Sequence, residues 1–276
     1  MAIIDRTRAR AAFADYVRPY GMDNPRIALK VVHTNRVAEA CEAVARAEGL
    51  PNGDVDLAWL CGLLHDIGRF EQLRRWDTFS DGDSAPHAAI GVEILFGSSS
   101  AGLDEALVTS KHECPITRFI EAREHDELIR TAVALHSDFR LPDALDGRTR
   151  LFCSIVRDAD KVDILRTLQE NTVQTILKVS DEAFLGSRFS EEALAAFRSH
   201  RCLRRAERHS PADYLLGLVA FVFELEHAES RRILHDRGYL QTFLERPFGL
   251  EPAFTDAETP RLYGEISREA LSYLER

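Results

Sequence analysis

VDLAWLCGLLHDIG, residues 55–68, is the most apolar helical segment of the chain. It follows Asp54, a residue type that often begins a helix, and its apolar residues would occupy nearly all sides of that helix. A helix that is apolar all round is buried by other elements. The segment therefore predicts a central helix surrounded by further secondary structure.

Helix signals recur along the rest of the chain, and strand signals are nearly absent. Asn24 and Pro25 form an N-cap followed by proline at the first helical position, and Gly49 and Pro51 stop the helix after Glu48. The sequence predicts an all-α fold whose first five helices cover about 24–48, 54–68, 84–97, 126–138 and 150–169.

Three serines mark helix starts. Ser84 is expected to cap the segment that ends at Gly97, and Ser190 and Ser210 to cap two helices in the C-terminal third. The run LLGLVAFVFELEH, residues 215–227, is typical of a buried helix. Aromatic residues are frequent in this third of the chain, which favours packing against a core.

Neither a linker rich in proline, glycine or serine nor a block of like charges divides the 276 residues. We therefore expect a single helical domain over 1–276, with a core at about 25–170 and a C-terminal helical extension at about 171–276.

Composition excludes several classes of protein. Apolar residues make up 45% and charged residues 29%, as in a folded globule, and no apolar run approaches the roughly 20 residues of a membrane helix. The first residues lack the apolar centre of a secretory signal, so a cytoplasmic protein is expected. A formal charge of -10 argues against a nucleic-acid surface. The five cysteines, without CxxC spacing, are expected to be free thiols.

Six side chains that can bind metals lie on apolar faces of the expected helices, at the three- and four-residue spacing of their apolar neighbours. They are His33, His65, His87, His136, Asp66 and Asp160. A single histidine on such a face is more often a hydrogen-bonded core residue than a ligand, and a single aspartate requires the same caution.

Taken together, the six groups favour metal ligands over isolated core residues. Six isolated buried polar groups would need six separate hydrogen-bonding solutions, whereas one metal site accommodates all of them. Imidazole nitrogens and carboxylate oxygens suit divalent Fe, Mn, Ni, Co, Zn or Mg. We therefore expect a centre for one or two divalent ions.

The dipeptide His-Asp occurs at 65–66, 125–126 and 235–236. Only the first pair lies in an apolar segment, and the other two lie in strongly charged surroundings that favour the surface. The context of the pair, rather than the dipeptide itself, indicates a site.

LLHDIGRF, residues 63–70, together with the upstream VVHTNRVAEA, 31–40, and the downstream RDADKVD, 157–163, resembles the HD-domain metal-dependent phosphohydrolase superfamily. The resemblance covers about residues 25 to 170 and implies a helical bundle. It implies one metal held by His33, His65, Asp66 and Asp160. In members with two metals, two further histidines complete a second site, which here would be His87 and His136, with Asp66 bridging.

Two alternatives remain open in this assignment. Asp158 is the reserve choice for Asp160, although the family pattern and the helical stripe both favour Asp160. His112 competes with His136, but it lies in a polar segment that contains proline.

Some nucleotidases of the superfamily carry a catalytic glutamate three residues after the Asp of the pair, where this chain has Arg69. Arg69 resembles the lysine of HDIGK-type members, which faces the substrate phosphate. We expect Arg69 and Lys161 to neutralise phosphate charge, although either could be a surface cation paired with an acid. Glu71 has the wrong spacing for a general base. Trp76 and Phe79 lie in a polar segment that could cover the site.

The expected function is hydrolysis of a phosphate ester, a nucleotide or a small phosphorylated metabolite, by a metal-activated hydroxide. Two alternatives are an HD-type di-iron oxygenase and a non-catalytic module that binds a metal or a metabolite. The expected partner is a small phosphate substrate, with neither a membrane nor nucleic acid, and the chain could form a homo-oligomer.

Overall fold

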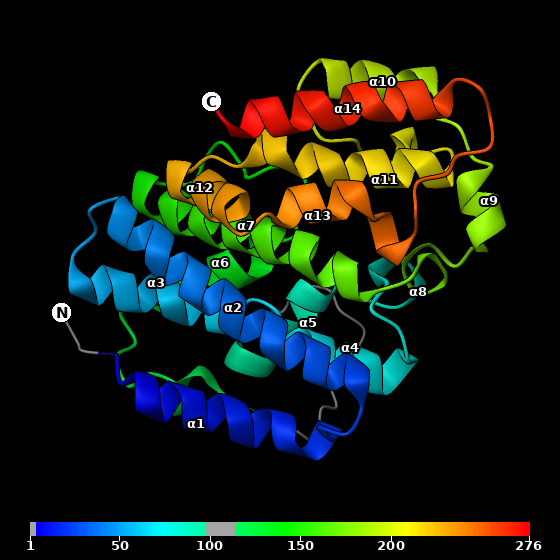
Figure 1. The fold of residues 1–276 in the computed structure, drawn as a ribbon. Coiled ribbons are helices and arrows are strands. Elements are labelled where there is room, and N and C mark those ends of the chain that lie inside the picture. Colours follow the sequence, from blue (N-terminus) through cyan, green and yellow to red (C-terminus); the bar gives the residue numbers. More distant parts are fainter. Residues whose placement is uncertain (1–3, 98–113) are drawn as a thin grey trace. The chain divides into compact units, whose positions relative to one another are not determined.

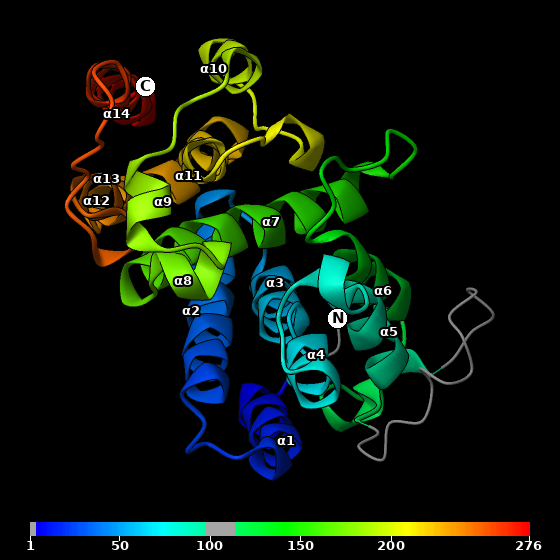
Figure 2. The ribbon, with the colours of Figure 1, turned by 90° about the vertical axis from the view of Figure 1, so that its right-hand side faces the viewer.

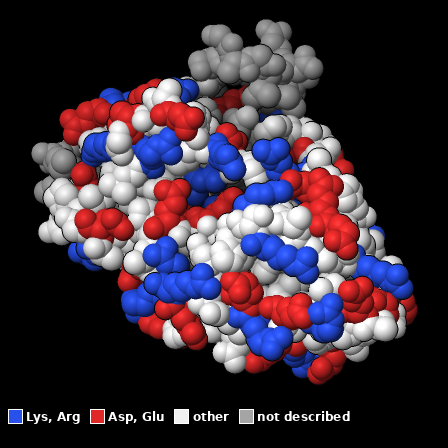
Figure 3. Space-filling view, turned by 90° about the horizontal axis from the view of Figure 1, so that it is seen from above, with Lys and Arg blue, Asp and Glu red and all other residues white. Residues whose placement is uncertain are grey.

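The computed structural model describes residues 4–97 and 114–276. Every regular element in these two ranges is a helix, and they contain no strand, so the predicted all-α fold is confirmed (Figure 1). No helix within them is both long and apolar enough to cross a membrane. On the face shown in Figure 3, basic and acidic side chains are interspersed, without a broad region of one sign among the described residues.

The chain forms two compact units, Met1–Asp160 and Lys161–Arg276. The chain passes from one unit to the other within a single helix, α7. The expectation of one domain over 1–276 stays a prediction. The long helices of the first unit are α1 (Arg6–Val17), α2 (Pro25–Ala47), α3 (Asn52–Leu64), α4 (Gly68–Trp76), α5 (His87–Phe96), α6 (Asp126–Leu135) and the larger part of α7 (Gly147–Thr167).

Helices α2 and α3 lie side by side and form the centre of the first unit (Figures 1 and 2). The Asn24 side chain accepts a hydrogen bond from the Arg26 amide, so the predicted cap of α2 is present. A Cβ atom at Gly62 would lie 2.8 Å from the Cα of Ala38. Glycine at this position therefore allows the two helices to approach closely.

The sequence predicted one helix over the apolar segment 55–68, and this prediction was wrong. Helix α3 begins at Asn52 and ends at Leu64, and a turn at residues 65–67 leads into α4. The pair His65-Asp66 therefore lies in the bend between two helices. The bend brings Gly68 against α5, where an added Cβ would lie only 2.1 Å from the carbonyl oxygen of His87.

The expected start of the third helix was also wrong. Ser84 ends a short 3₁₀ turn, Asp81–Asp83, and its hydroxyl donates to the Ser80 carbonyl, while Pro86 precedes the first residue of α5. The hydroxyl stabilises the preceding loop instead of capping the helix. Elsewhere, α6 ends three residues earlier than expected, and α7 begins at Gly147.

Apart from α14, the helices of the second unit are short. Ser190 and Ser210 cap α10 and α11 as predicted, each by accepting a hydrogen bond from a backbone amide three residues later. The run 215–227 is not one helix, because α11 ends at Val219 and a 3₁₀ segment follows. The helices are α8 (Val173–Leu177), α9 (Asp181–Leu185), α10 (Glu191–Arg198), α11 (Pro211–Val219), α12 (Ala228–Asp236), α13 (Tyr239–Glu245) and α14 (Thr259–Leu274).

Each unit has its own apolar core. The first core includes the fully buried Trp59 and Phe70, and the second includes Phe184, Phe243 and Phe248. The aromatic residues of the C-terminal third thus pack as the sequence indicated. All five cysteines are buried free thiols, also as expected.

Candidate metal centre

Six side chains from five parts of the first unit converge on one buried region. The five parts are α2, the bend after α3, the start of α5, the end of α6 and α7. The six side chains form three overlapping groups whose ligand atoms lie within 4.8 Å of one another in each group: His33, His65 and Asp66; His65, His136 and Asp160; Asp66, His87 and His136.

One part of this cluster surrounds the carboxylate of Asp160. His33 Nε2 lies 3.1 Å and His65 Nε2 3.6 Å from Asp160 Oδ1. The Nδ1 atom of His65 donates to the carbonyl of Gly62 at 2.7 Å, which directs its Nε2 into the cluster. This Nε2 is buried and has no hydrogen-bond partner among the described residues. A buried ring nitrogen in this state is suited to bind a metal.

The two oxygens of Asp66 face different histidines. Oδ2 lies 3.5 Å from His33 Nε2 and 3.7 Å from His65 Nε2. Oδ1 lies 3.4 Å from His87 Nε2 and 3.6 Å from His136 Nε2. A single carboxylate is therefore shared between two pairs of imidazoles.

His87 and His136 present their Nε2 atoms to each other at 2.9 Å. The Nδ1 of His87 lies 2.7 Å from a carboxylate oxygen of Asp81, and that of His136 lies 2.8 Å from the carbonyl of Val133. Both partners are acceptors, so each Nδ1 carries its ring proton, and in the neutral rings the two Nε2 lone pairs meet. A cation bound by both nitrogens would relieve this contact.

The charge states of the cluster suit a metal. Burial disfavours the charged form of Asp66, but its neighbours, above all the Lys30 ammonium, hold the pKa of Asp66 well below its usual value. Burial opposes ionisation of Asp160 in the same way, but the neighbouring imidazoles of His33 and His65 together outweigh it and hold the pKa of Asp160 well below its usual value. Burial is the main reason that the pKa of His87 falls to about 4. The centre therefore offers carboxylates and a neutral imidazole near pH 7.

The spacing of the ligand atoms fits a shared ion. Two ligands at about 2.1 Å from one metal lie roughly 3.0 Å apart at right angles and roughly 3.4 Å apart in a tetrahedron. The distances given above between individual pairs of ligand atoms run from 2.9 to 3.7 Å. Spacing and donor chemistry together show that these groups could hold a divalent metal.

Two residues near the centre were missed by the sequence reasoning. Lys30 Nζ lies 2.6 Å from Asp66 Oδ2, and Asp81 contacts the Nδ1 of His87. Lys30 lies one turn before His33 on α2, and this spacing was the only signal for it. Asp81 lies in a 3₁₀ turn within a polar segment, where no periodicity indicates the direction of a side chain.

Arg69 lies beside the centre. Its Nε is 3.4 Å from Asp66 Oδ1, and its terminal nitrogen donates to Asp81 at 3.0 Å and to the carbonyl of Phe79 at 2.6 Å. Its side chain is 16% exposed, so it is not a surface cation. Lys161 belongs to the second unit, where its ammonium lies 3.5 Å from Glu224.

Asp158 and Glu71 are not members of the ligand groups. The Asp that joins the histidines is Asp160 rather than the buried Asp158. His112 is outside the described residues. Glu71 is fully buried against Arg74 and Arg75.

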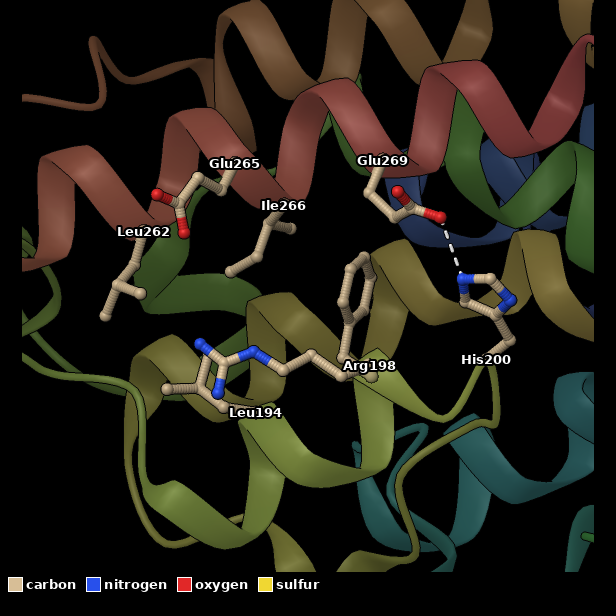
Figure 4. A pocket seen from close by; sticks show the side chains of 8 residues that line it. Leu194, Arg198, His200, Leu262, Glu265, Ile266 and Glu269 are labelled. Atoms are coloured by element: carbon tan, nitrogen blue, oxygen red, sulfur yellow. Dashed lines mark hydrogen bonds and ion pairs between the residues drawn. The ribbon is translucent and has the colours of Figure 1, made fainter.

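The second unit contains a separate hollow of about 300 Å³ between α10 and α14 (Figure 4). Leu194 and Arg198 line it from one side and Ile266 from the other, and His200 pairs with Glu269 at 2.8 Å at one end. Among the described residues, the groups suited to a metal all lie in the first unit, so this hollow is not part of the centre.

No curated protein and no solved structure gave a significant match to the chain. The family model described as the HD domain matches residues 31–182, which is more than half of the chain and includes all six clustered side chains. The sequence resemblance is thereby confirmed, and the chain belongs to the HD domain family.

Proposed function

We propose that this protein is a metal-dependent phosphohydrolase that acts on a nucleotide or a small phosphorylated metabolite. The observation that carries the proposal is the carboxylate of Asp66, whose two oxygens each face a pair of imidazoles. Members of the HD domain family are typically metal-dependent hydrolases, which supports the same reaction class.

His33, His65, Asp66 and Asp160 would hold one ion, and His87 and His136 would hold a second with Asp66 between them. When bound, divalent metal would lower the pKa of a coordinated water to near neutrality and polarise a phosphoryl oxygen. The imidazoles are directed by hydrogen bonds on their far nitrogens, so the donor atoms are held in place before any ligand arrives.

Arg69 would bind the substrate phosphate. Its guanidinium is held beside Asp66 by Asp81 and the Phe79 carbonyl, which restricts its motion. A planar cation with several donors can contact two phosphate oxygens at once. We propose Lys161 as a second cation for the phosphate. Its ammonium pairs with Glu224, so binding to a phosphate would have to compete with this ion pair.

The same donor set could bind two iron ions, which leaves a di-iron oxygenase as the alternative enzyme, and a complete site could also serve a non-catalytic sensor. Metal analysis of the purified protein, followed by a phosphatase screen with Mn, Mg, Ni, Co and Fe, separates these functions. We expect hydrolysis of at least one nucleotide or sugar phosphate.

Asp66→Ala should lose both metal and activity in this screen. A mixed-valent di-iron spectrum without phosphatase activity in any metal would refute the hydrolase proposal. Unchanged metal content in Asp66→Ala would refute the site assignment itself.

A further inference from the structure

Lys30 is a nearly buried cation in direct contact with the candidate centre. Its Nζ lies 2.6 Å from Asp66 Oδ2, and its side chain is 18% exposed. It lies on α2, one turn before His33, and therefore on the same side of that helix. Ordering a lysine in such a place costs side-chain entropy and hydration, so its position calls for an explanation.

The Asp66 oxygen that accepts from Lys30 also faces the metal ligands. Oδ2 is 3.5 Å from His33 Nε2, so an ion held by His33 and Asp66 would compete with the ammonium for this oxygen. The ion and the Lys30 ammonium would then lie close to the same oxygen, and two positive charges so close together repel strongly in a buried site. Lys30 would then need another anion close to the centre.

Arg69 stands in a similar relation to the other oxygen of Asp66. Its Nε is 3.4 Å from Oδ1. The Lys30 ammonium lies 5.5 Å and the Arg69 guanidinium 6.0 Å from the centre of the same Phe79 ring. The two cations therefore approach one carboxylate and one aromatic ring from α2 and α4.

The charges around Asp66 indicate which ligand would suit these cations. Lys30 and Arg69 carry two positive charges, whereas the three nearby carboxylates carry three negative ones, so these groups leave one net negative charge. The carboxylates are Asp66, Asp81 and Asp160. Two divalent ions would make the site strongly positive and favour the most negative form of a phosphate ester. A phosphate monoester approaches two negative charges near neutral pH, because its second pKa is about 6. A diester carries one.

We propose that Lys30 is a substrate-binding residue that releases Asp66 when metal binds and, with Arg69, contacts the terminal phosphate of a monoester. This inference rests on the proposed function and narrows it to monoesters.

The test compares Lys30→Met and Lys30→Arg with the wild type on a nitrophenyl phosphate monoester and its bis-nitrophenyl diester. We expect Lys30→Met to lower kcat/KM on the monoester about 10- to 100-fold, the effect of losing one charge-assisted hydrogen bond. The diester should lose much less, and Lys30→Arg should retain most of the monoester activity. Equal losses on both esters would refute the selection of monoesters.

Two binding measurements test Lys30 without turnover. By titration calorimetry, Lys30→Met should bind Mn²⁺ as tightly as the wild type or more tightly, because a competing ammonium is gone. Inorganic phosphate should bind the Mn²⁺-loaded variant about 10-fold or more weakly than the loaded wild type. Weaker Mn²⁺ binding would instead make Lys30 a structural support of Asp66 and overturn the proposal.

Arg26→Met is the matched control, because Arg26 lies one turn earlier on α2 and pairs with the exposed Asp77. It should match the wild type in all three measurements. If the wild type hydrolyses monoesters and Lys30→Met is equally active, only the role of Lys30 is refuted. A wild type that neither hydrolyses an ester nor binds phosphate would refute the proposed function.

Discussion

His87 owes its orientation to Asp81, whose two oxygens lie 2.9 and 2.7 Å from its Nδ1. The same carboxylate accepts from Arg69 and from Gln72, at 3.0 and 2.8 Å. Asp81 thus connects a candidate metal ligand with the candidate phosphate-binding arginine. Such a carboxylate fixes the tautomer of the imidazole and raises its basicity as a ligand.

Asp81→Ala should therefore weaken metal binding at the His87 and His136 side about 10- to 100-fold. Metal titration followed by mass spectrometry of the bound ions measures this effect. Asp77→Asn is the control, because the exposed Asp77 has a left-handed backbone that asparagine also tolerates. Undiminished binding of both ions by Asp81→Ala would contradict the role of Asp81.

The sequence favoured Asp160 over Asp158 because a helical stripe reports the direction of a side chain within a regular helix. In the structure, the carboxylate of Asp160 lies in one ligand group with His65 and His136. The contact of Lys30 with Asp66 could not be predicted in this way. It depends on the bend after α3, which places Asp66 within reach of α2, and helical periodicity gives no information about a bend.

At the scale of the helices, this bend is maintained by the close approach of α4 to α5. A Cβ on Gly68 would meet the His87 carbonyl oxygen at 2.1 Å and the Gly91 nitrogen at 2.6 Å, both of them backbone atoms. Neither can move without shifting α5, whose first residue is His87.

Gly68→Ala should lower the free energy of unfolding by about 1–3 kcal/mol through overpacking and should also reduce metal content, because His87 is displaced. Urea denaturation and metal analysis measure the two effects. Gly147→Ala is the control, since a Cβ there would meet nothing within 4 Å. A Gly68→Ala protein with wild-type stability would show that the two helices separate at little cost.

Glu71 has a structural role in α4 rather than a catalytic one. Its side chain is fully buried, lies 2.6 Å from Arg74 and from Arg75, and accepts a hydrogen bond from Tyr20 at 3.1 Å. Burial raises the pKa of Glu71, but the two arginines outweigh it and leave the pKa below its usual value.

Glu71→Ala should lower the free energy of unfolding by about 1–3 kcal/mol, because Tyr20 and Arg75 lose charge-assisted hydrogen bonds to the buried carboxylate, while metal content stays unchanged. The folded pKa is depressed, so the contribution of the carboxylate is present above the unfolded pKa of about 4.3 and is lost as the pH falls through the folded pKa. Denaturation at pH 7 and near pH 4 should therefore show a smaller difference between variant and wild type at the lower pH. A difference that grows in acid would contradict this assignment.

The helix boundaries show where prediction from sequence ended. The caps at Asn24, Ser190 and Ser210 were predicted because a short polar side chain before a helix acts locally. The end of α3 at Leu64 was missed because the apolar pattern continues through Ile67, which is buried as well. Burial on both sides of a bend produces the same pattern as one helix.

At the scale of the whole molecule, thermal unfolding tests both the binding of metal and whether the two units unfold together. Both tryptophans, Trp59 and Trp76, lie in the first unit, so tryptophan fluorescence reports on that unit, whereas circular dichroism follows the helices of both. The family match continues past Asp160 to residue 182 and so extends into the second unit. This supports the proposal that the chain unfolds as one domain.

A single domain predicts coincident thermal transitions by the two probes, and the candidate centre predicts that metal raises both. At 100 times its dissociation constant, an ion that binds only the folded state adds about 2.7 kcal/mol, which corresponds to a rise in Tm of roughly 5 °C or more for a chain of this size. Chelation should reverse the rise, and Asp66→Ala should show none. If only the fluorescence transition moves with metal while a second transition by circular dichroism stays fixed, the two units unfold independently and the single-domain proposal is wrong. If neither moves, the six side chains do not bind the added ion in the folded state.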